Sequence, residues 1–151
     1  MALIQRAEIL NPHDNVGYLI KRCGIQLSVT IDRGLAEFGM THAQLSIFLR
    51  LFSGSAKTAS DLAREQMTDT GSMTRMLDRL EEKNFIARKR HLTDRRIVEV
   101  ELTDKGRELA DQMIDVALHC LNHHLRGFTP EEVEMFKGFL RRVATNNSPE
   151  L

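Results

Sequence analysis

The chain lacks the features that mark a secreted or membrane-spanning protein. Its first ten residues are interrupted by Gln5, Arg6 and Glu8, so they do not resemble a signal peptide. No apolar run among the 151 residues approaches the length that a membrane span requires. We therefore expect a cytoplasmic protein with one domain, residues 1–151, and no membrane partner.

Cysteine is scarce, and the two cysteines do not form a metal motif. Cys23 and Cys120 lie in separate helical patterns and share no ligand spacing. In a cytoplasmic protein both are expected to be reduced thiols. Cys23 falls on an apolar stripe, so we expect it to be buried and unreactive. The sequence predicts no metal site and no cofactor.

Motifs of catalysis are also missing. The sequence holds no Ser-His-Asp or Cys-His order, no Gly-rich phosphate loop and no metal-binding signature. We therefore expect no catalytic residues, and the chain is predicted not to be an enzyme.

Net charge is absent as well, because 21 Lys and Arg balance 21 Asp and Glu. A neutral chain argues against bulk affinity for nucleic acid, but the distribution of charge matters more than its sum. Residues 88–96 hold five Lys and Arg against one Asp, whereas residues 97–151 hold six against ten acids. Such a local basic segment suits a DNA binder with salt-dependent affinity, although taken alone it is an ordinary solvated hairpin.

The stretch from Thr58 to Thr103 carries the most informative pattern. Thr58 followed by Asp61 is typical of a helix start. Residues 67–72 then interrupt the periodicity, and a second helix follows with apolar side chains at helical spacing, namely Met73, Met76, Leu77 and Leu80. Two short helices joined by a tight turn predict a helix-turn-helix, whose second helix can enter the major groove of DNA.

Two alternating segments follow, at residues 86–90 and 97–102. The second has an apolar face made of Val98, Val100 and Leu102. Arg95 and Arg96 lie between the segments, so the pattern predicts a hairpin with a basic tip. A helix-turn-helix followed by such a hairpin is a winged helix, and its wing arginines can reach phosphates or the minor groove.

Helical patterns flank this block on both sides. Residues 16–38 form an amphipathic pattern that is expected to end near Gly39. A central apolar helix is predicted after the capping residue Thr41, and two further helices are predicted after Thr103 and Thr129. The predicted fold is therefore mainly α: six helices with a two-stranded β-hairpin wing.

The terminal helices carry more apolar surface than one small domain can cover. The economical solution is a two-fold dimer that interlocks residues 12–40 and 104–146, with residues 41–103 as the winged helix-turn-helix. Two recognition helices would then lie about one DNA turn apart, roughly 34 Å, which predicts a pseudo-palindromic operator. The alternative is a monomer whose terminal helices fold back.

Two segments resemble motifs of the MarR family of bacterial transcriptional regulators. Residues 69–80, DTGSMTRMLDRL, resemble the recognition helix of that family. Residues 94–96, DRR, followed by VEVELTDKG at 98–106, resemble its wing signature. The resemblance implies a homodimer that binds double-stranded operator DNA, with repression as the family's habit and a small aromatic carboxylate or phenol as effector.

The predicted DNA contacts lie in the recognition helix and the wing. Arg75 can bind guanine through two hydrogen bonds, and the family pattern assigns Arg96 to the minor groove. Asp94 is expected to hold the wing loop. The predicted DNA-binding residues are Thr70, Ser72, Thr74, Arg75, Arg79, Arg88, Lys89, Asp94, Arg95 and Arg96.

The resemblance also implies an effector site in the cleft between the winged helix and the dimer helices. An Arg beside a Met offers a cation to a carboxylate and a soft apolar wall to a ring. The predicted ligand-binding residues are Tyr18, Arg22, Phe48, Thr74, Met76, Arg79 and Arg88. For Arg79 and Arg88, DNA contacts or surface ion pairs are an equal alternative.

Three alternatives remain open. A winged helix can serve as a protein-interaction module, although such a module has no need of a basic wing tip. Cys23 can act as a redox switch if it is accessible. His119 and His123, with His124 nearby, can supply part of a zinc site, but a solvated or interface pair of histidines is the simpler interpretation.

Overall fold

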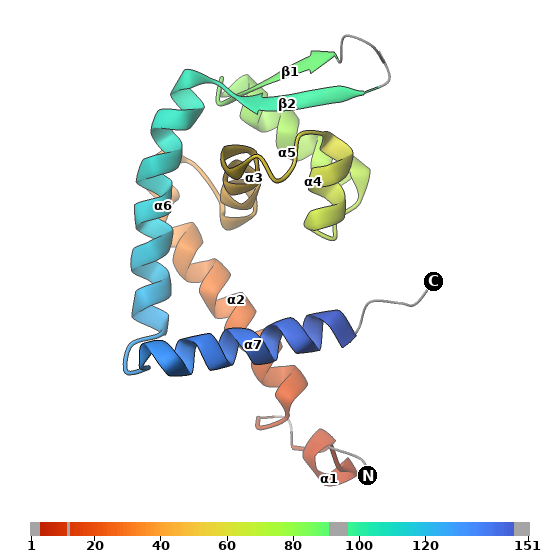
Figure 1. Ribbon diagram of the computed structural model, residues 1–151, viewed down its shortest axis with the longest axis vertical. Helices are drawn as coiled ribbons and strands as arrows, with labels where there is room; N and C mark the ends of the chain where they lie inside the picture. The colour runs from red at the N-terminus through yellow and green to blue at the C-terminus, as the bar shows by residue number, and fades with distance from the viewer. Residues whose placement is uncertain (1–3, 12, 91–96, 147–151) are drawn as a thin grey trace. The chain divides into compact units, whose positions relative to one another are not determined.

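The computed structural model describes residues 4–11, 13–90 and 97–146. Within these residues the chain forms seven α-helices, one 3-10 helix and a two-stranded antiparallel sheet, which confirms the predicted mainly α fold with a hairpin. The one-turn helix α1 is an addition to the six predicted helices. The chain divides into two compact units, residues 1–120 and 121–151. The 3-10 helix is η1 (Ala36–Phe38). The elements that Figure 1 labels are α1 (Arg6–Ile9), α2 (Val16–Gly34), α3 (His42–Ser53), α4 (Ala59–Glu65), α5 (Thr70–Glu82), β1 (Ile86–Arg90), β2 (Val98–Leu102), α6 (Asp104–His124) and α7 (Pro130–Asn146).

Local side-chain caps decide where the helices begin. Thr41 and Gln44 form a reciprocal capping box at the start of α3, in which the Gln44 N–H donates to Thr41 Oγ1 over 3.3 Å. At the start of α4, Thr58 Oγ1 accepts a hydrogen bond of 3.1 Å from the N–H of Asp61. Each bond satisfies a backbone donor that the first helical turn leaves without a partner. The predicted helix starts at Thr41 and Thr58 are confirmed.

The long helix α2 ends earlier than its apolar pattern predicted. It stops at Gly34, and the tighter η1 precedes Gly39, which turns the chain with a φ of 61°. The Leu35 carbonyl accepts a hydrogen bond of 3.0 Å from the Phe38 N–H, a spacing typical of a 3-10 turn. This local tightening occurs where the fully buried Leu35 enters the core. The periodic pattern continues through this change, so it did not reveal the break.

The helix-turn-helix surrounds a buried apolar core. The central helix α3 buries Leu45, Ile47 and Phe48, but Leu49 and Phe52 are exposed, so the helix is buried on one side and not all round as its apolar pattern predicted. Phe48 packs edge-on against Phe85 with ring centroids 6.0 Å apart. Aromatic pairs favour this geometry. The recognition helix α5 and its partner α4 complete the core with Leu62, Met73, Leu77 and Leu80. Because one side of α5 is buried in this core, the opposite side of the helix faces solvent.

The wing strands pair as the predicted antiparallel hairpin, but the predicted alternation is absent from the burial of β1, which decreases steadily toward the tip. Ile86 lies opposite Leu102, and Arg90 lies opposite Val98. The face made by Val100 and Leu102 is buried, whereas Val98 is exposed near the tip. The Val100 N–H also donates to the carbonyl of Lys57 over 2.8 Å, so the segment before α4 lies alongside β2. The hairpin is therefore attached to the first helix of the helix-turn-helix as well as to α5.

A close backbone contact joins the wing to the start of α6. A Cβ atom placed on Gly106 would lie 2.1 Å from the carbonyl oxygen of Phe85, a distance that no side chain can occupy. Thr103 Oγ1 accepts from the Gly106 N–H over 3.0 Å and donates to the carbonyl of Asn84 over 2.8 Å. The predicted cap at Thr103 is confirmed, and the contact explains why glycine stands at position 106.

The second unit contains helix α7, whose start is capped by a reciprocal pair. The Thr129 N–H donates to Glu132 Oε2 over 2.8 Å, and the Glu132 N–H donates to Thr129 Oγ1 over 3.2 Å. Several large apolar side chains of this unit are exposed: Phe128, Met135, Phe136, Phe139, Leu140 and Val143. In the first unit, α2 likewise exposes Val16, Leu19, Ile20, Ile25 and Val29. No helix of the described residues is both long and apolar enough to cross a membrane.

Candidate nucleic-acid interface

The first turns of α5 present a polar, exposed face. Thr70, Thr74, Arg75 and Arg79 are exposed, and Ser72 is half-buried. Met73, Leu77 and Leu80 on the opposite side are fully buried in the core. The side chains predicted to contact DNA from this helix are therefore brought together on one surface, with their direction set by the core.

Hydrogen bonds hold the N-terminal end of α5 in a defined arrangement. Asp69 Oδ1 accepts from the Ser72 N–H over 2.8 Å and caps the helix. Hydrogen bonding to the Ser72 side chain and backbone keeps the pKa of Asp69 below its ordinary value. Arg75 Nη2 donates to Ser72 Oγ over 2.9 Å, and Thr74 Oγ1 donates to the carbonyl of Thr70 over 2.8 Å. The exposed guanidinium of Arg75 keeps further donors for a partner.

Arg88 is engaged within the protein. Its Nη1 lies 2.6 Å from Asp78 Oδ1 and 3.3 Å from Glu81 Oε2, and its Nη2 donates to the carbonyl of Thr74 over 3.3 Å. Its side chain is only 25% exposed. The Arg88 N–H also donates to Glu81 Oε1 over 3.2 Å. Arg88 therefore ties strand β1 to the recognition helix, and a contact with DNA or an effector would have to compete with two carboxylates.

The other predicted wing residues fall partly outside the described region. Lys89 forms an ion pair with Glu101 on the neighbouring strand, and its side chain remains mostly exposed. Asp94, Arg95 and Arg96 lie outside the described residues, so their roles stay predictions.

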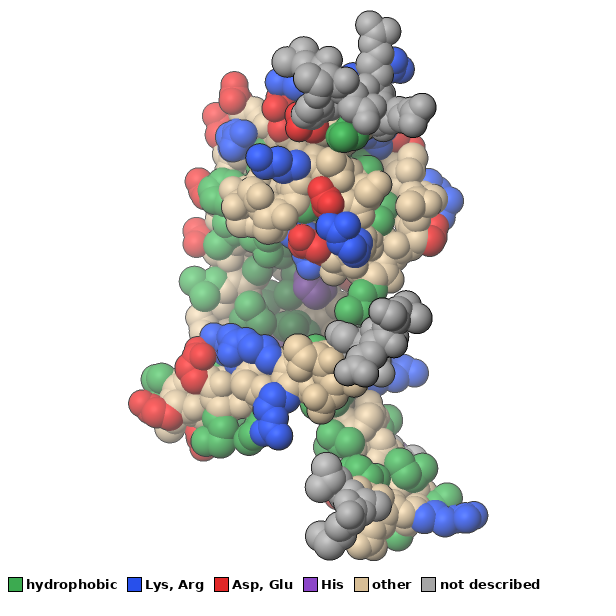
Figure 2. Space-filling view, turned by 45° about the vertical axis from the view of Figure 1, so that its right-hand side comes forward, with side chains coloured by type: hydrophobic (Ala, Val, Ile, Leu, Met, Phe, Trp, Pro, Cys, Tyr) green, Lys and Arg blue, Asp and Glu red, His purple; other side chains and the backbone are tan. Residues whose placement is uncertain are grey.

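Two exposed cations near these elements did not stand out in the sequence. Lys57 is exposed and directly precedes the cap of α4. Arg64 on α4 is 75% exposed and pairs with Asp61 over 2.8 Å. Figure 2 shows Lys and Arg side chains interspersed with Asp and Glu on the face that it presents. Neither residue belongs to a local motif, and the position of Lys57 beside β2 is seen only from the hydrogen bond between its carbonyl and the Val100 N–H.

The predicted effector residues occupy different surroundings. Tyr18 and Arg22 lie together on α2, with the guanidinium 6.0 Å from the ring centroid. Met76 is partly buried against the core. Phe48 is fully buried, so a ligand that contacts it would have to open the core. A shallow hollow of about 340 Å³ beside Arg88 is lined by acids, namely Asp78, Glu81 and Glu82.

The cysteines and histidines require one correction. Cys23 was predicted to be buried, but its side chain is exposed, whereas Cys120 is buried. The apolar stripe of α2 is largely uncovered at this end, and periodicity does not tell which part of a stripe is covered. Among the described residues, no three His, Cys, Asp or Glu side chains converge in a way that could hold a metal ion.

The buried core, the exposed helix α5 and the paired strands define a winged helix-turn-helix protein. Comparison with known proteins agrees. The model of the MarR family matches residues 40–98. The regulator SarZ of Staphylococcus epidermidis is 25% identical over 113 residues, which are 75% of each chain. The repressor MdtR of Bacillus subtilis is 32% identical over 95 residues, covering 63% of this chain and 61% of MdtR.

A solved structure shows the same fold. A mutant MarR from Escherichia coli, complexed with operator DNA, superimposes with a TM-score of 0.79 at 24% identity, covering 93% of this chain and 99% of that one. Residues 40–98 are thus similar to the MarR family, whose members are transcription regulators and not enzymes. This similarity confirms the predicted resemblance and agrees with the prediction that the chain is not an enzyme.

Proposed function

We propose that this protein is a cytoplasmic repressor that binds a pseudo-palindromic operator as a homodimer and is released by a small aromatic or phenolic acid. The observation that carries the proposal is the polar face at the start of α5, which Asp69 caps. The first turns of this helix carry Thr70, Ser72, Thr74 and Arg75. A helix so placed can enter the major groove, with its first turns at the base edges.

Arg75 is the residue that we assign to base recognition. It is exposed and is held by one hydrogen bond to Ser72, which leaves the rest of its guanidinium for the two acceptors of a guanine. Arg79 lies one turn later on the same exposed side, and we assign it to a phosphate. Lys89 and the wing residues Asp94, Arg95 and Arg96 complete the predicted surface.

The homodimer is supported by the uncovered apolar surfaces of the terminal helices. In α2 and α7, exposed apolar side chains recur at helical spacing, such as Leu19 and Ile20 in one and Phe136 and Phe139 in the other. Isolated apolar side chains on a surface are ordinary, but contiguous exposed stripes mark interfaces. We propose that residues 12–40 and 104–146 of two copies cover one another.

The effector would act on the junction between β1 and α5. Arg88 already binds Asp78 and Glu81 there, so a carboxylate ligand would replace these partners and loosen the tie between wing and recognition helix. The proposed site also includes Thr74, Met76 and Arg79, which lie on α5, the same helix that carries Asp78 and Glu81. Tyr18 and Arg22 on α2, and Phe48 in the core, are the weaker members of this proposed site.

The test is fluorescence anisotropy of the protein on DNA from upstream of its own gene. Replacement of Arg75 by Ala should weaken binding by about 1–3 kcal/mol, because a contact to a base edge is lost. The matched control is Arg107→Ala on the exposed side of α6. Binding should also weaken steeply as salt rises. An Arg75→Ala protein with wild-type affinity would overturn the assignment.

The second arm adds benzoate-like and salicylate-like acids to the complex. Release by one such acid supports the effector class, whereas DNA binding that no acid changes removes it and leaves Cys23 as the candidate sensor. Absence of specific binding to any upstream fragment would favour the protein-interaction alternative.

A further inference from the structure

The hydroxyl of Ser72 lies between two charged side chains at the start of the recognition helix. It accepts a hydrogen bond of 2.9 Å from Arg75 Nη2. Hydrogen bonding from the same side chain is also the largest cause of the lowered pKa of Asp69. A hydroxyl has one donor and two acceptor positions, so Ser72 can donate to the carboxylate and accept from the guanidinium at the same time. Ser72 therefore links the capping carboxylate of α5 to Arg75.

Gly71 leaves room for this arrangement. A Cβ atom placed on Gly71 would lie 3.6 Å from Arg75 Nη1 and 3.1 Å from Asp69 Oδ1. The guanidinium of Arg75 thus extends back over the first turn of α5, in the direction that helical side chains favour. A long side chain at position 71 would occupy the place of the guanidinium. The first turn therefore combines a free surface above Gly71 with an acceptor, Ser72, that fixes Arg75 there.

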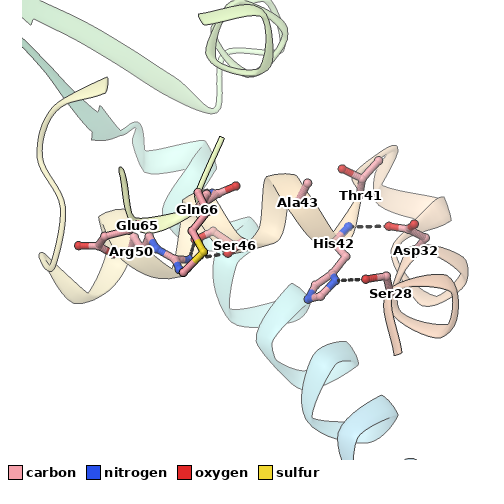
Figure 3. A pocket seen from close by; sticks show the side chains of 10 residues that line it. Ser28, Asp32, Thr41, His42, Ala43, Ser46, Arg50, Glu65 and Gln66 are labelled. Atoms are coloured by element: carbon pink, nitrogen blue, oxygen red, sulfur yellow. Dashed lines mark hydrogen bonds and ion pairs between the residues drawn. The ribbon is translucent and has the colours of Figure 1, made fainter. Parts of the chain in front are cut away.

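Two other arginines of the first unit serve as references for Arg75. Arg79 is exposed one turn later on α5, and its guanidinium has no hydrogen-bond or ion-pair partner among the described residues. Arg50 lies in a pocket of about 440 Å³ around Gln66, which residues of α2, α3 and α4 line. Figure 3 shows its ion pair with Glu65, in which Arg50 Nε lies 2.8 Å from Glu65 Oε2. Arg75 is exposed like Arg79 but has a hydrogen-bond partner like Arg50.

The restraint on Arg75 matters for recognition because a long side chain loses rotamer freedom when it binds. A side chain that is already ordered in its bound direction loses less, so it binds more tightly. The bond to Ser72 uses one N–H of Arg75 and leaves the others for O6 and N7 of a guanine.

We propose that Ser72 is a positioning residue for base recognition, which acts through Arg75 and not through a contact of its own with DNA. It holds the guanidinium over the first turn of α5, where it meets one guanine in each half-site of the operator. This inference rests on the proposed function and changes the predicted role of Ser72 from a DNA contact to a support for one.

The first experiment measures fluorescence anisotropy on operator variants in which each base pair is replaced in turn. The base pairs at which Arg75→Ala loses discrimination are those that Arg75 reads. Ser72→Ala should reduce discrimination at the same base pairs by about three- to tenfold, because the freed guanidinium must be ordered on binding. No reduction, a reduction at different base pairs, or an equal loss of affinity for every sequence would overturn the proposal.

Combined and conservative variants separate the hydroxyl from the rest of the helix. Ser72→Ala keeps the backbone N–H that Asp69 caps, so the helix start is retained. In a protein that carries Arg75→Ala, the added Ser72→Ala change should have no further effect on operator affinity, whereas additive losses would overturn the proposal. Ser72→Thr keeps a hydroxyl and should restore discrimination. The matched control is Ser53→Ala at the exposed end of α3, which should discriminate as the wild type does.

A measurement on the free protein distinguishes a failure of this inference from a failure of the proposed function. Nuclear magnetic resonance order parameters of the Nε–H groups report how ordered each arginine side chain is. With Arg50 as the ordered reference, Arg75 should be more ordered than Arg79 in the wild type and as mobile as Arg79 in Ser72→Ala. Equal mobility of Arg75 in both proteins would overturn the positioning role. An Arg75 that Ser72 orders, in a protein that binds no operator, would support the positioning and contradict the proposed function.

Discussion

Gly106 allows the first turn of α6 to lie directly against the backbone of the wing. Replacement by Ala would force a methyl group to within 2.1 Å of the Phe85 carbonyl, so the backbone would have to shift. We expect a loss of about 1–3 kcal/mol in the free energy of unfolding, measured by urea denaturation. Gly24→Ala on α2, where a Cβ meets nothing within 4 Å, should instead stabilise by up to about 1 kcal/mol. Equal effects at the two sites would contradict the account of the contact.

Asp69 gives the start of the recognition helix a dependence on pH. Its pKa is lowered in the folded state by hydrogen bonds from the Ser72 side chain and backbone. A lowered carboxyl pKa stabilises the fold above the ordinary value of about 3.9, and this contribution is lost as pH falls through the folded pKa. Asn also caps helices but does not titrate.

The advantage of the wild type over Asp69→Asn should therefore shrink as pH falls from about 5 to below 3. Urea midpoints measured at several pH values test this, with Asp111→Asn on α6 as the control. A difference between the two proteins that stays constant across this range would show that the charge of Asp69 contributes nothing.

At the scale of elements, Arg88 joins strand β1 to helix α5. Its removal should weaken operator binding by changing how α5 is held, and not by losing a DNA contact, because its guanidinium is already bound to Asp78 and Glu81. The Arg88→Ala change should also lower the free energy of unfolding by about 1–2 kcal/mol. This loss is smaller than that of a fully buried charged hydrogen bond, because solvent screens the partly exposed ion pair.

A double-mutant cycle separates these two roles. If Arg88 acts through Asp78, then Arg88→Ala should have a smaller effect on operator affinity in a protein that already carries Asp78→Ala. Fully additive losses in anisotropy would instead mean that Arg88 contacts the DNA itself.

The elements were predictable where their causes are local. The caps at Thr41, Thr58 and Thr103 depend on side chains within three residues, and the alternation of β2 depends on one face of one strand. The early end of α2 and the exposure of Cys23 depend on what packs against that helix, which periodicity does not reveal. The side chains in the first turns of α5 that were predicted to face outward do lie on an exposed face of the helix.

The site was less predictable for the same reason. Arg88 was selected as a DNA residue because it lies in the basic wing segment, and as an effector residue because the resemblance to the MarR family implied it. Its partners Asp78 and Glu81 are ten and seven positions away, respectively, and meet it only after β1 folds back along α5. The pocket around Gln66 likewise combines three helices, and no local motif marks it.

At the scale of the whole molecule, the proposed binding to a specific DNA site depends on the proposed dimer. A single recognition helix reads too few base pairs for a specific site, and two copies related by a two-fold axis read a repeated one. The exposed apolar stripes of α2 and α7 are the surfaces available for that association.

Hydroxyl-radical footprinting on the upstream fragment tests this hypothesis most directly. The account predicts two protected regions related by a pseudo-two-fold axis, with centres about one helical turn apart, and both should disappear together in the Arg75→Ala protein. A single protected region, or no protection at concentrations that saturate the anisotropy signal, would contradict it.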